Sequence, residues 1–167
     1  MTGGATEHNK IALNFCRRFP LSISDRDYEI YMNDVRFWIE AQRIYTYPDV
    51  MVVQGPPIYE GKSKAMIVNP QIILEVLSDS TQSYDRTEKF RYYRSISSFR
   101  EYLLVDQYNY YVEKFFKTED EQWIYEAYES EESVIRLNSV EFQITCHDHT
   151  DRVLFADKSV SLPNDRE

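Results

Sequence analysis

The segment NPQIILEVLSDS, residues 69–80, decides the fold of this chain. Residues 72–74 and 76–77 are aliphatic, and the one polar residue among them is Glu75. Such an apolar run predicts a strand that is buried on both faces of a sheet. Taking an ionised carboxylate out of water costs free energy unless a cation, a metal or hydrogen-bond donors meet it. We therefore expect Glu75 to have partners elsewhere in the chain.

One candidate partner lies upstream, in the segment YTYPDVMVV, residues 45–53. Here Asp49 directly follows Pro48, and proline is tolerated at the first position of a strand, where its missing N–H breaks no ladder bond. Asp49 is therefore expected to open a strand. A second carboxylate near Glu75 follows if the two strands are neighbours.

The other candidate lies downstream, in YDRTEKFRYYRSI, residues 84–96. We predict a helix here, with Asp85 as its N-cap and Glu88 at the third helical position. Lys89 then falls in the first turns, close to the carboxyl end of the preceding strand. Its aliphatic stem is expected to pack, which leaves the ammonium free to reach Glu75.

Five segments in this order resemble one known family: MTGGATEHNKIALN (1–14), YPDVMVV (47–53), NPQIILEVLSDST (69–81), YDRTEKFRYYRSI (84–96) and EYLLVDQ (101–107). The chain resembles the Uma-type family of restriction-endonuclease-like proteins, within the PD-(D/E)xK nuclease superfamily. Each segment alone is a weak motif, but five in register over about residues 1–158 are fairly specific.

The resemblance implies an α/β (α+β) restriction-endonuclease-like fold, with a mixed central sheet flanked by helices. We expect a single domain over residues 1–167. Its core spans about residues 6–107, and an antiparallel strand-rich extension spans about 108–158. The family has a further helix and hairpin before the text that begins here at Met1, so we expect a shortened member.

The resemblance also implies a hydrolase that cleaves phosphodiester bonds of DNA with Mg²⁺, and Mn²⁺ is the alternative ion. Asp49 and Glu75 are then the metal ligands, and both are catalytic residues. The superfamily places its lysine two residues after the glutamate, where this chain has Leu77. Lys89 is therefore the candidate catalytic lysine, which orients or helps to deprotonate the attacking water and stabilises the developing charge.

The charge of the chain is unevenly distributed. The net charge is −9, which argues against a general nucleic-acid binder. Residues 1–100 nevertheless carry 13 Lys and Arg against 12 Asp and Glu, whereas residues 101–167 carry 6 against 16. Nucleic acid is therefore expected over the basic helix and the glycine- and proline-rich loop before it, at Lys62, Lys64, Arg86, Arg91 and Arg94. A solvated helix face is the alternative interpretation of this helix, and solvation of the loop tip is the favoured one for the two lysines.

Further elements follow from periodicity. Apolar residues at helical spacing predict a helix from Thr6 to Phe19. Residues 28–32 and 35–39, separated by Asn-Asp, are typical of a hairpin. The aromatic-rich strands after Tyr108 favour a homodimer, because they exceed what one sheet face of a small domain hides.

The remaining expectations concern location and alternatives. Two cysteines without CxxC spacing, and no signal peptide or long apolar run, predict a cytoplasmic protein without membrane contact. A structural role is favoured for His8, and a zinc site at His147 and His149 is disfavoured because no second ligand pair has suitable spacing. The alternative function is a catalytically inactive module that binds nucleic acid or protein on the same fold.

Overall fold

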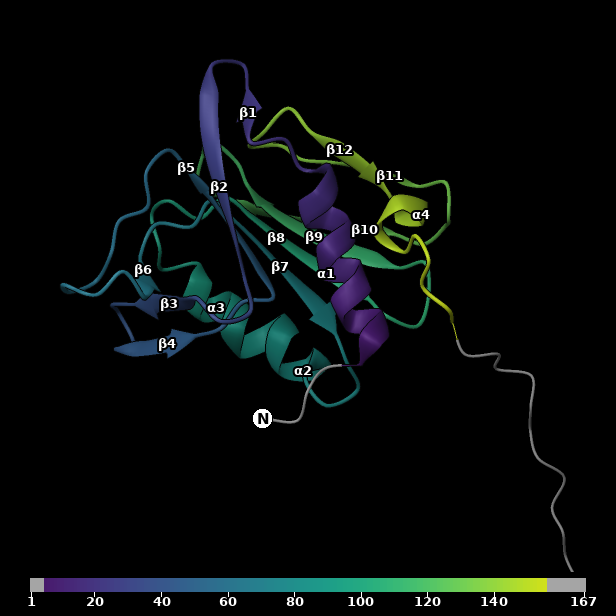
Figure 1. Cartoon of the computed structure of the whole chain (residues 1–167), viewed down its shortest axis with the longest axis horizontal. Coiled ribbons are helices and arrows are strands. Elements are labelled where there is room, and N and C mark those ends of the chain that lie inside the picture. Colours follow the sequence, from purple (N-terminus) through teal and green to yellow (C-terminus); the bar gives the residue numbers. More distant parts are fainter. Residues whose placement is uncertain (1–4, 156–167) are drawn as a thin grey trace, which may run out of the picture.

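The computed structural model describes residues 5–155, in which a mixed seven-stranded sheet forms the centre (Figure 1). The strands lie in the order β1-β2-β5-β7-β8-β9-β10. Only β7 and β8 are parallel, and each other neighbouring pair is antiparallel. The strands are β1 (Ser22–Ile23), β2 (Arg26–Met32), β5 (Val50–Gln54), β7 (Ile72–Leu77), β8 (Glu101–Asp106), β9 (Val112–Lys117) and β10 (Trp123–Tyr128).

The middle strand β7 is buried along its whole length, as its apolar sequence predicts. Its side chains alternate between two hydrophobic clusters, one on each face of the sheet. Helix α1 (Thr6–Arg18) packs on the first face, together with the short sheet β11 (Val134–Arg136) and β12 (Gln143–Thr145) and the helical turn α4 (Cys146–His149). The mixed sheet flanked by helices is therefore the fold that the sequence predicts.

The second face is covered by a helical segment that follows β7. It consists of α2 (Gln82–Tyr84), a π-helical turn η1 (Asp85–Lys89) and α3 (Phe90–Tyr93). The prediction that Asp85 caps this helix is wrong, because the helical residues begin three positions earlier. The backbone N–H of Asp85 already donates to Thr81 O, and its carboxylate is buried against Lys89.

The predicted hairpin of residues 28–32 and 35–39 is also wrong. Strand β2 pairs with β1 and β5, whereas β3 (Arg36–Ile39) pairs with β4 (Ile44–Thr46) and β6 (Met66–Ile67) in a separate three-stranded sheet. Tyr28 packs in the first cluster, but Phe37 and Ile39 pack in the second. The Asn-Asp turn therefore takes the chain from the central sheet to a separate sheet that packs on its second face.

The expected antiparallel extension is present in part. Strands β9 and β10 continue the central sheet from β8, but β11 leaves it and pairs with β12. The final residues of the expected extension, 156–158, lie outside the described residues. Between residues 5 and 155, no helix has the length and apolar character needed to cross a membrane.

Candidate active site

Asp49 and Glu75 lie side by side at one end of the β5–β7 pairing, in the middle of the central sheet. Strands β5 and β7 are antiparallel, and Val50 pairs with Leu74, so Asp49 stands beside Glu75 one step beyond the last ladder pair. The backbone N–H of Asp49 donates to Glu75 Oε2 at 3.2 Å. In return, the backbone N–H of Val76 donates to Asp49 Oδ2 at 2.8 Å. The convergence expected from the sequence therefore exists, and two backbone donors fix it.

Lys89 reaches Glu75 from the helical segment. Its Nζ lies 3.1 Å from Glu75 Oε1 and 2.8 Å from Asp85 Oδ1. The ammonium therefore reaches Glu75, as the sequence predicts, and it also contacts Asp85. Both carboxylate residues are only 2% exposed. The hydroxyl of Tyr93 donates to the same Glu75 Oε1 at 3.1 Å, so Glu75 has a fixed orientation.

The π-helical turn places these groups together. Asp85, Lys89 and Tyr93 recur every fourth residue and all face Glu75 or its neighbours. The hydroxyl of Tyr102, on β8, donates to the Asp85 carbonyl at 2.9 Å and ties the turn to the sheet. Such π-turns are common at functional sites, because they change which residues of a helix share one face.

His8 joins the site from the opposite face of the sheet. It lies in the first turn of α1, and its Nε2 is 3.1 Å from Asp49 Oδ2. The hydrogen bond that His8 donates to Asp49 raises the pKa of His8 above its usual value, against the effect of burial. The predicted structural hydrogen-bonding role is consistent with this contact, which orients Asp49.

The site has more negative than positive groups. The pKa of Glu75 is raised to about 8, mainly by burial and also by the Asp49 and Asp85 carboxylates, while Lys89 lowers it. Burial also disfavours the charged form of Lys89, but the two carboxylates beside it outweigh this effect and raise its pKa. The lysine is therefore a cation at neutral pH. Carboxyl groups still outnumber the basic side chains at the site.

These groups line a pocket of about 800 Å³. Its other lining side chains include Asn9, Tyr47, Ser80 and Gln107. Within residues 5–155, no group of three or more His, Cys, Asp or Glu side chains could hold a metal ion by itself. Mg²⁺, however, is usually bound by one or two carboxylates, with water and substrate phosphates completing its shell. Two adjacent carboxyl groups, Asp49 and Glu75, fit such an ion when both are ionised.

The position two residues after Glu75, where the resemblance places a lysine, cannot provide an ammonium in this chain. Leu77 is 3% exposed and packs in the second hydrophobic cluster, where an ammonium would have no partner. Lys89, from the helical segment after β7, contacts Glu75 instead. Asp79 lies outside this arrangement: it is exposed and lines a separate, neighbouring pocket.

The predicted nucleic-acid-binding residues are not equivalent. Lys62 and Lys64 are exposed in the loop between β5 and β6. Arg91 and Arg94 are exposed on the outer side of α3. Arg86 differs, because its guanidinium pairs with Glu113 at 2.7 Å and holds the helical segment against β9.

The two C-terminal histidines lie in the helical turn α4. His147 is exposed and pairs with Glu131 at 2.9 Å. His149 is fully buried and stacks on Phe15, and burial lowers its pKa to about 3. Neither histidine is near the Asp49 pocket, and a packing role accounts for His149.

Three site residues were missed from the sequence. Asp85 was interpreted as a cap, and Tyr93 and Thr46 were not considered as site residues. Thr46 contacts the Tyr93 hydroxyl at 3.1 Å and so supports it. The four-residue spacing of Asp85, Lys89 and Tyr93 is the signal that indicates a shared polar face on the helix.

Comparisons with known proteins identify the family of this chain. The family model Uma2, described as "Putative restriction endonuclease", matches residues 1–147. Two relatives come from Synechocystis sp. The "Uncharacterized protein sll1609" is 43% identical over 124 residues, which cover 74% of this chain and 70% of the relative. The "Uncharacterized protein slr1290" is 33% identical over 140 residues, which cover 84% of this chain and 72% of the relative.

A solved structure shares the fold. It is the crystal structure from Anabaena variabilis titled as a "putative nuclease belonging to DUF820", and it superposes with a TM-score of 0.71. The alignment covers 90% of this chain and 84% of that chain, at 14% identity. From the family match over residues 1–147 and the two relatives, the chain belongs to the Uma2 family.

Proposed function

We propose that this protein is a cytoplasmic Mg²⁺-dependent endonuclease that hydrolyses phosphodiester bonds of DNA at the Asp49–Glu75 pair. The observation that carries the proposal is the meeting of these two carboxylates with Lys89 in one pocket. Two carboxylates and a cationic side chain are what hydrolysis of a phosphodiester requires. Membership of the Uma2 family supports the same reaction class.

Asp49 and Glu75 are the proposed metal ligands, and Mn²⁺ is the alternative ion. When bound, such an ion supplies Lewis-acid stabilisation of the charge that develops on the phosphate and lowers the pKa of water. The protein contributes the orientation of both carboxylates. The Val76 N–H and His8 hold Asp49, while the Asp49 N–H and Tyr93 hold Glu75.

Lys89 is the proposed electrostatic catalyst. Its pKa is raised by the neighbouring carboxylates, so it stays protonated at neutral pH and cannot accept a proton from water. A fixed cation is suited to stabilise the negative charge of the pentavalent transition state. Of the two roles that the sequence suggested for Lys89, charge stabilisation is therefore favoured over deprotonation of water.

DNA is proposed to bind over Arg91, Arg94 and the loop of Lys62 and Lys64. These four cations are exposed, so they are available to phosphates. Arg86 is omitted from this surface, because its ion pair with the buried Glu113 already uses its guanidinium. The acidic C-terminal half repels phosphate and is not part of the proposed surface.

Cleavage of supercoiled plasmid tests the function. Wild type should nick the plasmid with Mg²⁺ or Mn²⁺ and should be inactive with EDTA. Asp49→Asn and Glu75→Gln should both be inactive, because each removes a proposed ligand. Asp120→Asn, an exposed carboxylate on the turn before β10, is the matched control and should nick at the wild-type rate. Metal-dependent nicking that survives in both site variants would contradict the proposal.

A non-catalytic binding module is the second candidate. The observation that favours it is that Lys89 already bridges Glu75 and Asp85, which places a protein cation beside a proposed ligand. This candidate requires DNA binding that is unchanged by EDTA and by Glu75→Gln. The plasmid assay, run with a gel-shift measurement on the same samples, separates the two.

We also propose a homodimer. Tyr108, Ile124 and Tyr125 are exposed on or beside the outer strands β9 and β10 of the central sheet, and this supports association of two copies. Light scattering at high protein concentration should give twice the mass of the chain. A strict monomer would contradict this proposal without affecting the nuclease proposal.

A further inference from the structure

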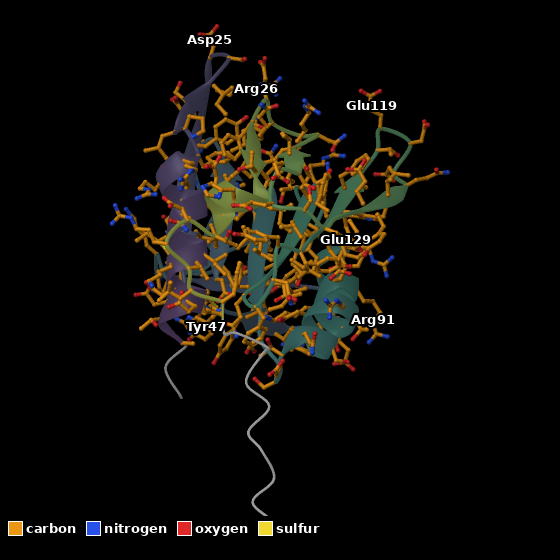
Figure 2. The ribbon with its side chains drawn as sticks, turned by 90° about the vertical axis from the view of Figure 1, so that its right-hand side faces the viewer. Asp25, Arg26, Tyr47, Arg91, Glu119 and Glu129 are labelled. Carbon is orange, nitrogen blue, oxygen red and sulfur yellow. The ribbon has the colours of Figure 1, made fainter. Side chains whose placement is uncertain are left out.

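A second polar pocket lies at the end of the sheet opposite to the Asp49 pocket. Figure 2 shows Arg26 and Glu119, which line it, at one end of the molecule, with Tyr47 and Arg91 at the other. Its volume is about 620 Å³. The lining includes three cationic side chains, one carboxylate and several amides and hydroxyls, among them Arg26, Arg100, Lys117, Glu119, Gln71 and Asn138.

The sheet ladder holds three of these residues side by side. The Arg100 N–H donates to Gln71 O at 2.8 Å, and the Lys117 N–H donates to Arg100 O at 2.9 Å. The Gln71 N–H donates to Val52 O at 2.8 Å. Because these backbones are paired, the positions from which the side chains project are fixed before any ligand binds.

The charge of this pocket is opposite to that of the chain. Arg26 and Arg100 form no ion pair with any side chain of residues 5–155. Lys117 pairs with Glu121, which is 77% exposed, so solvent screens that pair. Two unpaired guanidiniums in one pocket of a protein with a net charge of −9 indicate an anion-binding site.

Gln71 adds a hydrogen-bond acceptor to the wall. It is only 6% exposed, and its Nε2 donates to Ser139 O at 3.2 Å, which fixes the orientation of the amide. Its Oε1 is buried and has no hydrogen-bond partner among the described residues. Buried amide oxygens are usually paired, and Oε1 is closed off from solvent, so a ligand that carries a donor would satisfy this atom once the Gln71 side chain turns toward the pocket.

We propose that this pocket binds a small phosphorylated molecule that also carries hydroxyl or amino donors, with the chemistry of a nucleoside monophosphate. Arg26 and Arg100 would hold the phosphate, since guanidinium forks match its oxygens. Lys117 adds a third positive charge, and Gln71 selects for the donor. The volume lies in the range of small-molecule sites, about 300–1,000 Å³. The proposal does not depend on the nuclease function.

Calorimetric titration of the full chain in EDTA at low ionic strength tests it, with AMP, inorganic phosphate and adenosine as probes. EDTA removes divalent cations, so phosphate cannot collect at the Asp49 pocket through a metal. AMP should bind most tightly, phosphate more weakly, and adenosine not detectably. Arg26→Gln and Arg100→Gln should each weaken AMP binding by about tenfold or more. Arg43→Gln, an exposed arginine outside both pockets, should bind AMP as the wild type does.

Amide chemical shifts provide a readout that does not depend on affinity. AMP should move the signals of Gln71, Arg100 and Lys117 and leave those of Asp49 and Glu75 unchanged. Adenosine that binds as well as AMP would overturn the phosphate site, as would unchanged binding in both arginine variants. Phosphate that binds as tightly as AMP would overturn the role given to Gln71.

Discussion

Lys89 Nζ lies 3.1 Å from Glu75 Oε1, although the two residues are fourteen positions apart in the sequence. The superfamily lysine lies two positions after its glutamate, a place that Leu77 takes here. The helical segment after β7 returns over the sheet and delivers an ammonium to the same carboxylate. An ammonium therefore contacts Glu75 although the position two residues after it is a leucine.

Loss of this ammonium should reduce cleavage more than metal binding. In Lys89→Ala we expect plasmid cleavage to fall by about 10²–10³, the usual contribution of one group that stabilises charge in the transition state. Lys89→Arg keeps the charge and should retain more activity than the alanine variant. Single-turnover rates with saturating Mn²⁺ give the comparison, and a wild-type rate in Lys89→Ala would transfer the role to another cation.

The same substitution should also destabilise the protein. The ammonium lies between two buried carboxyl groups, Glu75 and Asp85. Removing one partner of a buried ion pair typically costs about 3–5 kcal/mol. We expect a loss of this order in the unfolding free energy of Lys89→Ala at pH 9, and a smaller loss at pH 6, where the Glu75 carboxyl, whose pKa is about 8, is protonated. Urea denaturation at the two pH values measures both, and an equal loss at both would contradict the explanation.

Glu75 should make stability depend on pH. Burial raises its pKa in the folded protein to about 8, above the usual value of 4.5. The folded state thus holds the proton more tightly than the unfolded state does. This contribution to stability is complete below about pH 4.5 and is lost as the pH rises through 8.

Glu75→Gln removes the titrating group, so its unfolding free energy should depend less on pH between 5 and 8. Relative to wild type, the variant should therefore become more stable as the pH rises, by at most about 1.4 kcal/mol per pH unit. Denaturant titrations in EDTA at several pH values provide the measurement. A constant difference between the two proteins would show that the pKa of Glu75 is not raised.

Tyr93 should stabilise the site through its hydroxyl. Tyr93→Phe leaves Glu75 Oε1 with one donor fewer and leaves Thr46 without its partner. An unmet buried polar group costs about 1–3 kcal/mol, and the melting temperature should fall accordingly. Tyr45→Phe, whose side chain is half exposed, is the control and should melt like the wild type. Equal melting of all three proteins would show that the Tyr93 hydroxyl contributes nothing.

DNA binding should depend on the exposed arginines. Arg91→Glu with Arg94→Glu should abolish binding at low salt, because both guanidiniums face solvent on α3. Arg86→Gln should instead lower stability, since it breaks the pair with Glu113. Fluorescence anisotropy with labelled DNA, in the inactive Glu75→Gln background, separates the two effects. Unchanged affinity of the double variant would place DNA elsewhere.

The central elements were predictable from local pattern. An apolar run with one carboxylate predicted β7, and Pro48 predicted the strand that Asp49 precedes. Their antiparallel pairing then brought the two carboxylates together. These inferences succeed because burial on both faces strongly restricts which sequences can form the middle of a sheet.

The remaining features depend on tertiary contacts that no local pattern contains. Residues 35–39 have the alternating apolar pattern of a hairpin partner of β2. Phe37 nevertheless packs against Tyr93 in the second hydrophobic cluster. Asp85 has the sequence context of a cap, but the buried Lys89 gives its carboxylate a stronger partner inside the π-turn. His8 approaches Asp49 only because α1 crosses the face of β7 (Figure 1).

Binding of Mn²⁺ tests most directly whether Asp49 and Glu75 form a divalent-cation site. Electron paramagnetic resonance counts free Mn²⁺ without requiring activity, so it applies equally to inactive variants. We predict one bound Mn²⁺ per chain in the wild type and in Lys89→Ala, and none in Asp49→Asn or Glu75→Gln. Asp120→Asn serves as the control for loss of one carboxylate. Wild-type Mn²⁺ binding in both Asp49→Asn and Glu75→Gln would contradict the proposed site.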